Sequence, residues 1–168
     1  MGVHCVKKIL CFYFLYLLVG ISIFFTGSNV VLAAKNIATN VPNTVTGTMG
    51  DDKMYGLNGK DSLYGLGGND ALQGDNGDDF VDGGPGKDSL EGNDGNDIVQ
   101  GGAGTDKIDG GKGNDTLIAS FALGTVSFRD YSADSVVCGP GYDTAFINPV
   151  DGDTASDDCE VIVAETSQ

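Results

Sequence analysis

The amino-acid sequence predicts an all-β solenoid, in which short strands alternate with tight turns. Eight nonapeptides follow one another without a gap from Gly47 to Ile118, and such a fixed period is typical of repeat architectures. Within the nonapeptide, each kind of residue keeps a fixed place. Beyond residue 33 we find no long stretch with the 3.6-residue periodicity of an amphipathic helix, so we expect almost no helix there.

Glycine defines the turn half of each nonapeptide. The first place is held by Gly47, Gly56, Gly65, Gly74, Gly83, Gly92, Gly101 and Gly110. The fourth place is held by Gly50, Gly59, Gly68, Gly77, Gly86, Gly95, Gly104 and Gly113. Glycine adopts backbone angles that are closed to other residues, and it therefore allows carbonyl groups to turn toward a common point.

The strand half follows an aspartate. The sixth place is held by Asp52, Asp61, Asp70, Asp79, Asp88, Asp97, Asp106 and Asp115. The eighth place is held by Met54, Leu63, Leu72, Val81, Leu90, Val99, Ile108 and Leu117. Because side chains alternate along a strand, the eighth residue is expected to point inward. Two nonapeptides then make one coil, with a turn at each edge.

The array resembles the RTX (hemolysin-type) calcium-binding nonapeptide repeat, GGxGxDxUx, of small secreted bacterial calcium-binding proteins. The resemblance implies a right-handed parallel β-roll with several Ca²⁺ ions between turns two repeats apart. It pairs Asp52 with Asp70 and so on to Asp97 with Asp115, which gives about six sites. It also assigns backbone ligands at Gly56, Gly65, Gly74, Gly83, Gly92, Gly101 and Gly110. In the second place, glycine is present only at Gly84, Gly102 and Gly111.

Charge and ligand chemistry favour calcium over the alternatives. The array holds 15 acidic residues against 5 lysines, a net charge of −10, and the whole chain has −15, which excludes nucleic acid as a natural partner. A solenoid without ions and a disordered acidic tract are the alternatives, and the strict register argues against disorder. Magnesium prefers a tight octahedron and keeps its waters, and zinc lacks its usual histidine ligands here. We expect the array to be disordered without calcium.

The N-terminus resembles a secretory signal peptide over residues 1–33. Lys7 and Lys8 precede an almost wholly apolar stretch of 17 residues, and Val31-Leu32-Ala33 follows as a cleavage motif before Ala34. An uncleaved membrane anchor is the alternative. Cleavage predicts a protein that is secreted or at the cell surface, with no stable membrane span. Residues 34–46 are then a linker or an N-terminal cap.

Residues 119–168 are expected to form a short C-terminal β cap. A strand-like run covers 125–129, a degenerate repeat covers 138–146, and a closing strand covers 159–163. Asp143 keeps the sixth place of that repeat as a further candidate ligand, whereas the loop 151–153 is interpreted as solvated. Cys138 and Cys159 are the only cysteines after residue 33, so an exported chain is expected to join them in a disulfide. Reactive thiols are the alternative, and they would need a nearby base or cation.

The function predicted from the sequence is non-catalytic calcium binding in a structural or adhesive role, with an unidentified partner at the cell surface or in the matrix. The only histidine, His4, lies in the predicted signal peptide, so a Ser-His or Cys-His pair is absent from the exported sequence. Two alternatives stay open: a calcium-dependent accessory module of an RTX enzyme or toxin, and a solenoid that binds sugar, ice or protein. Tyr55 and Tyr64 in ninth places would suit the second alternative.

Overall fold

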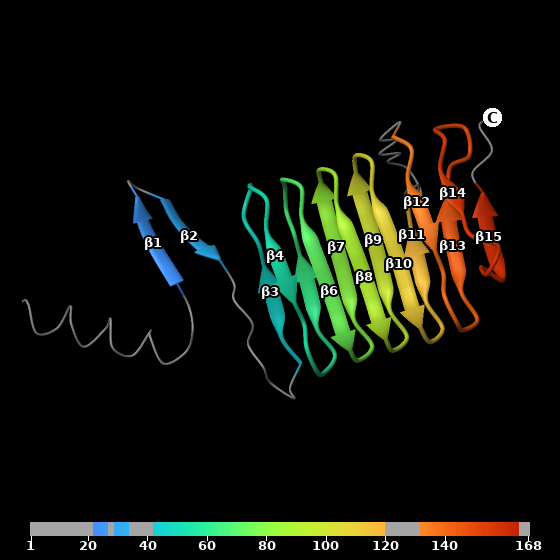
Figure 1. Cartoon of the computed structure of the whole chain (residues 1–168), viewed down its shortest axis with the longest axis horizontal. Coiled ribbons are helices and arrows are strands. Elements are labelled where there is room, and N and C mark those ends of the chain that lie inside the picture. The colour runs from blue at the N-terminus through green and yellow to red at the C-terminus, as the bar shows by residue number, and fades with distance from the viewer. Residues whose placement is uncertain (1–21, 27–28, 34–41, 120–131, 165–168) are drawn as a thin grey trace, which may run out of the picture.

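The computed structural model describes residues 22–26, 29–33, 42–119 and 132–164. Residues 42–119 and 132–164 wind into a stack of flattened coils with a β-strand on each side, which confirms the all-β solenoid (Figure 1). The described ranges contain no helix. Accordingly, nothing in them is a helix with the length and apolar character needed to cross a bilayer.

Two parallel sheets form the two sides of the stack. The seven-stranded sheet consists of β3 (Thr44–Thr46), β5 (Ser62–Tyr64), β7 (Phe80–Pro85), β9 (Ile98–Ala103), β11 (Thr116–Ile118), β13 (Thr144–Ile147) and β15 (Val161–Ala164). The six-stranded sheet consists of β4 (Lys53–Tyr55), β6 (Ala71–Asn76), β8 (Ser89–Asp94), β10 (Lys107–Lys112), β12 (Ser135–Val137) and β14 (Thr154–Ala155). Successive strands along the chain therefore alternate between the sheets.

The register confirms that two nonapeptides make one coil. Met54 aligns with Leu72, and Leu72 with Leu90, so each eighth-place residue lies beside the one 18 positions later. All eight of these side chains point inward and are at most 1% exposed. The core is thus one row of aliphatic side chains from each sheet, which is thin for the length of chain that it must hold in order.

The described part of residues 119–168 adds further coils to the roll. β12 pairs with β10, and β13 pairs with β11, in the register of the array. Val136 and Ala145 continue the buried rows, whereas Ile162 in the last coil is 49% exposed. The predicted closing strand is β15, and the degenerate repeat supplies β13. The strand-like run 125–129 lies outside the described residues.

An antiparallel pair of strands precedes the roll. β1 (Ser22–Thr26) pairs with β2 (Asn29–Ala33), and Phe24 aligns with Val31. Both strands lie within the predicted signal peptide, whose cleavage stays a prediction.

Candidate metal centres

From the third repeat onward, the turns at both edges of the roll stack so closely that only glycine fits the fourth place. A Cβ built on Gly77 would lie 1.6 Å from the carbonyl oxygen of Gly59, and one built on Gly95 would lie 1.6 Å from that of Gly77. Gly77 and Gly95 also have φ angles of 146° and 153°, which L side chains rarely adopt. The fourth-place glycines therefore set the spacing at which oxygen atoms of successive turns meet.

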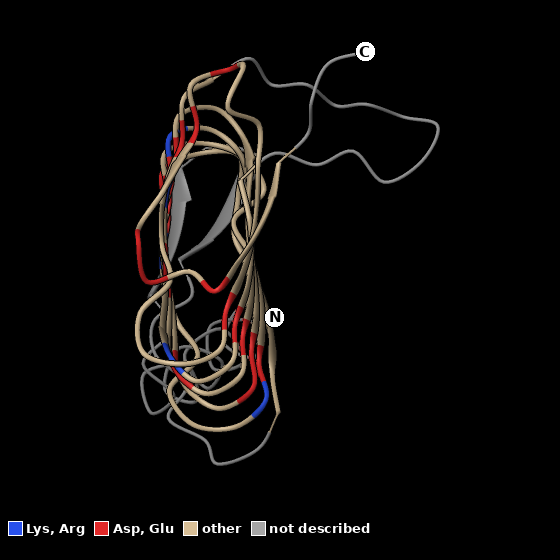
Figure 2. Ribbon diagram, turned by 90° about the vertical axis from the view of Figure 1, so that its right-hand side faces the viewer, with Lys and Arg blue, Asp and Glu red and all other residues tan. Residues whose placement is uncertain are grey.

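Sixth-place aspartates form a continuous hydrogen-bonded row along each edge. The backbone N–H of Asp61 donates to Oδ1 of Asp79, which lies one coil later, at 2.7 Å. The same bond, at 2.7 or 2.8 Å, joins Asp52 to Asp70, Asp70 to Asp88, Asp79 to Asp97, Asp88 to Asp106 and Asp97 to Asp115. All six predicted pairs thus face each other in adjacent turns. Figure 2 shows acidic positions superposed from coil to coil at the edges of the roll.

In six of these aspartates, the second carboxylate oxygen is buried without a donor. The side chains of these six are at most 3% exposed, and no described residue donates a hydrogen bond to their Oδ2 atoms. These six are Asp61, Asp70, Asp79, Asp88, Asp97 and Asp115. Burial of a charged oxygen without a partner is costly, so each of these carboxylates lacks a positively charged partner.

Burial also changes the acidity of the row. It raises the pKa of Asp79, Asp88 and Asp115 to about 6 and that of Asp97 to about 7. The backbone N–H donated to each carboxylate lowers its pKa and offsets part of this effect, whereas neighbouring carboxylates raise the pKa further. A cation at the Oδ2 atoms would relieve both burial and mutual repulsion.

Carbonyl oxygens of first-place glycines lie close to the Oδ2 atoms of the sixth-place aspartates. A Cβ built on Gly92 would lie 2.5 Å from Oδ2 of Asp97 and 2.5 Å from the carbonyl oxygen of Gly110, one coil later. The carbonyls of Gly65, Gly74, Gly83, Gly92, Gly101 and Gly110 all occupy this position. Glycine is thus needed in the first place to leave room for two oxygens. A Cβ on Gly56 would likewise meet a glycine carbonyl and an aspartate carboxylate. The residue one coil before Gly56, which the carbonyl of Gly56 would face, lies outside the described residues.

The donor set fits Ca²⁺, which takes hard oxygen ligands from carboxylates and backbone carbonyls. Within the described ranges, no three His, Cys, Asp or Glu side chains gather into one compact cluster. Each site would therefore combine sixth-place carboxylates of two stacked turns with a first-place carbonyl. A bound ion would supply the positive charge that the buried Oδ2 atoms lack.

Comparison with known families agrees with this geometry. The model of the RTX calcium-binding nonapeptide repeat, four copies long, matches residues 46–81 and again residues 82–117. The array belongs to the RTX calcium-binding repeats. No curated protein and no solved structure matches the chain. The match covers the RTX array, residues 46–117, and agrees there with the resemblance of its motifs.

The hydrogen-bonded rows of the RTX array continue beyond the eight nonapeptides into Asp143, a candidate ligand from the sequence, and into Asp134, Asp153 and Glu160, which the sequence had not singled out. The N–H of Asp106 donates to Oδ1 of Asp134 at 2.7 Å, and the N–H of Asp134 donates to Oδ1 of Asp153 at 3.0 Å. On the other edge, the backbone N–H of Asp115 donates to Oδ1 of Asp143 at 2.7 Å, and the backbone N–H of Asp143 donates to Oε2 of Glu160 at 2.8 Å. Asp134-Ser135-Val136 keeps the Asp-x-aliphatic triplet of the repeat. That triplet is the one signal that was available for Asp134.

A second ladder lies outside the first. Fifth-place side chains accept from the backbone of the next coil: the N–H of Asn96 donates to Oδ1 of Asp78 at 3.0 Å, and that of Asn114 donates to Oδ1 of Asn96 at 2.9 Å. These bonds satisfy turn N–H groups that carboxylates of the inner row do not reach. The fifth place accordingly holds mostly short polar residues.

From the second repeat onward, the second place adopts the left-handed conformation whether or not it is glycine, whereas Thr48 in the first repeat does not. Gly84 has φ 93°, while Leu57 and Leu66 have φ 76° and Asn93 has φ 79°. A bulky L residue is disfavoured in this region. The early RTX turns therefore keep the geometry of the later ones at some cost in backbone strain.

Proposed function

We propose that this protein is exported, folds on binding several Ca²⁺ ions outside the cell, and serves there as a non-catalytic structural or adhesive element. The observation that carries the proposal is the row of buried aspartates whose Oδ2 atoms lack a hydrogen-bond donor. Such carboxylates oppose folding in the absence of a cation and favour it when one is bound. The free energy of calcium binding then contributes directly to folding.

The thin core supports calcium dependence. Eight inward side chains of the array each contribute about 2 kcal/mol on burial, whereas ordering the backbone costs about 1–2 kcal/mol for every residue. The ion pair between Lys112 and Asp94 (2.8 Å) adds little to the free energy of folding. It lies at the surface, where such pairs contribute about 0–1 kcal/mol.

A non-catalytic role is supported by the chemistry of the remaining groups. The buried sixth-place aspartates are already engaged in the inner ladder, and Cys138 and Cys159 are joined in a disulfide rather than held as thiols. The sequence beyond residue 33 contains no histidine to act as a general base beside a serine or cysteine.

The proposal is tested by titrating free calcium from nanomolar to 10 mM and following the far-UV circular dichroism of the exported protein. Weak extracellular calcium sites have Kd values of about 10⁻⁴–10⁻³ M, so half-maximal folding is expected in that range. Complete folding at submicromolar calcium would contradict a role tied to the exterior. N-terminal sequencing should give Ala34 as the first residue, and an intact Met1 on membrane-bound protein would contradict cleavage.

A further inference from the structure

The space between the stacked turns of Asp115 and Asp143 has the features of the candidate calcium sites in the array. Asp143 lies beyond the matched repeats. The N–H of Asp115 donates to Oδ1 of Asp143 at 2.7 Å. The Asp143 side chain is completely buried, and no described group donates to its Oδ2. Oδ2 of Asp115 is likewise buried without a donor. Two carboxylate oxygens from stacked turns therefore lack a positive partner here.

Cys138 supplies the backbone carbonyl that completes this gap. A Cβ built on Gly110 would lie 2.6 Å from Oδ2 of Asp115 and 2.7 Å from the carbonyl oxygen of Cys138. The Cys138 carbonyl thus stands where a first-place glycine carbonyl stands in every array gap. The rest of the turn also agrees, since Gly139 has φ 91° and a Cβ on Gly141 would lie 1.5 Å from the carbonyl oxygen of Gly113.

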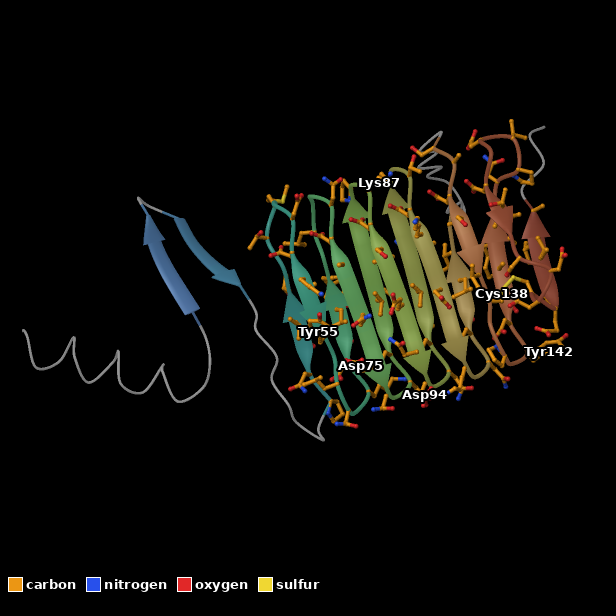
Figure 3. All side chains as sticks on the ribbon, in the orientation of Figure 1. Tyr55, Asp75, Lys87, Asp94, Cys138 and Tyr142 are labelled. Atoms are coloured by element: carbon orange, nitrogen blue, oxygen red, sulfur yellow. A yellow bond between two sulfur atoms is a disulfide. The ribbon has the colours of Figure 1, made fainter. Side chains whose placement is uncertain are left out.

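The side chain of Cys138 marks the end of the row. In the array, a Cβ in the first place would collide with the carbonyl oxygen of the next coil. The coil after Cys138 is one residue shorter, because Glu160 lies 17 residues after Asp143 instead of 18. Here the first place carries a sulfur atom bonded to Cys159, with the two Cα atoms 5.2 Å apart (Figure 3). Glu160 is exposed, unlike the buried aspartates. The disulfide thus joins the last two turns of this edge where the array would place an ion.

We propose that one Ca²⁺ ion binds between Asp115 and Asp143 with the carbonyl of Cys138 as a further ligand, that no ion binds between Asp143 and Glu160, and that the Cys138–Cys159 disulfide stabilises this terminal site. The proposal rests on the calcium binding proposed above, and it names a site outside the matched repeats.

Calcium and the disulfide are then thermodynamically linked, because one residue contributes both the ligand carbonyl and the bonded sulfur. A dithiol reductant converts the disulfide to two thiols with two electrons and two protons and is itself oxidised to a cyclic disulfide. Reduction releases the last coil and weakens the terminal site. Reciprocally, a bound ion makes the disulfide harder to reduce.

The first test counts calcium ions per chain by native mass spectrometry, on protein made from the full chain in an exporting host. Asp143→Asn keeps the size and the Oδ1 acceptor but removes the charge, and it should lose one ion relative to wild type. Glu160→Gln should lose none. Asp157→Asn, at an exposed position, is the matched control for loss of one charge. Retention of every ion by Asp143→Asn, or loss of an ion by Glu160→Gln, would overturn the proposal.

The second test follows reduction of the Cys138–Cys159 bond by dithiothreitol at saturating calcium. Asp143→Asn should be reduced about tenfold faster than Asp157→Asn, and equal rates would overturn the linkage. Asp97→Asn separates the two proposals. If it loses calcium and Asp143→Asn does not, the terminal site fails while calcium binding by the array stands. If the wild-type protein binds no calcium, both fail.

Discussion

The backbone N–H of Asp79 donates a 2.7 Å hydrogen bond to Oδ1 of Asp97, one coil further along the roll. Both side chains are buried, and Oδ2 of Asp97 is left without a donor. One carboxylate thus has two roles: one oxygen fixes the register of the coils, and the other is available to a cation. Folding and calcium binding therefore depend on the same side chains.

Asp97→Asn should weaken calcium binding while it preserves the register. An asparagine still accepts the N–H of Asp79 through Oδ1, but it brings no negative charge to the cation. The calcium concentration at half-folding should rise by about tenfold, which corresponds to ~1.4 kcal/mol for each ion bound on folding. The measurement is a calcium titration followed by far-UV circular dichroism.

Asp94→Asn is the matched control, because Asp94 is exposed and its carboxylate pairs with Lys112 at the surface. Its titration should nearly coincide with that of the wild type. An equal shift in both variants would show that net charge, rather than the buried row, determines affinity.

Acidification should stabilise the calcium-free roll. The folded pKa is raised to about 6 for Asp79, Asp88 and Asp115 and to about 7 for Asp97, above the ordinary value of 3.8. Between these limits the folded chain binds more protons than the unfolded chain, so this stabilisation is lost as the pH rises toward 7. Calcium-free protein should gain β-structure from pH 8 to pH 5, and a gain in the opposite direction would contradict the pKa shifts.

Leu66→Gly should stabilise the folded protein by about 1 kcal/mol. Leu66 is 43% exposed and has φ 76°, a conformation that costs an L residue about 1–2 kcal/mol. Urea unfolding at saturating calcium measures the change. Gly84→Ala is the reverse experiment, because its Cβ would lie 2.2 Å from the carbonyl oxygen of Leu66. That variant should be less stable, and a less stable Leu66→Gly would show that the leucine contacts outweigh the strain.

Gly77→Ala should separate two coils. The added Cβ would lie 1.6 Å from the carbonyl oxygen of Gly59, so the turns must move apart, and we expect a loss of more than about 2 kcal/mol. Gly50→Ala changes the same place in the first repeat, where the nearest atom is Oγ1 of Thr48 at 3.9 Å. Thermal unfolding of both variants in calcium provides the comparison, and similar melting temperatures would argue against tight stacking as the reason for glycine here.

The nonapeptide period was sufficient to predict the coils and the pairing of aspartates. Glycine and aspartate recur every nine residues, and this spacing alone brings Asp79 beside Asp97. The period does not reveal that Oδ1 accepts a backbone N–H, because that depends on the side-chain angle within a stacked turn. Only the structure shows that Oδ1 accepts the backbone N–H while Oδ2 has no donor.

The irregular end of the roll was harder to predict. Asp134 lies 28 residues after Asp106, and Asp153 lies 19 after Asp134, so neither falls on the period of 18. Both still join the row, because the hydrogen bond responds to the position of the turn and not to the length of chain between turns. A search for Asp-x-aliphatic triplets at any spacing would have found Asp134.

The most direct test is the far-UV circular dichroism spectrum of the exported protein after removal of calcium by a chelator, followed by addition of calcium or magnesium. The buried carboxylate rows predict loss of the β-spectrum in chelator and its cooperative recovery with calcium but not with magnesium. A β-spectrum that persists in excess chelator at pH 8 would contradict the claim that calcium holds the coils together.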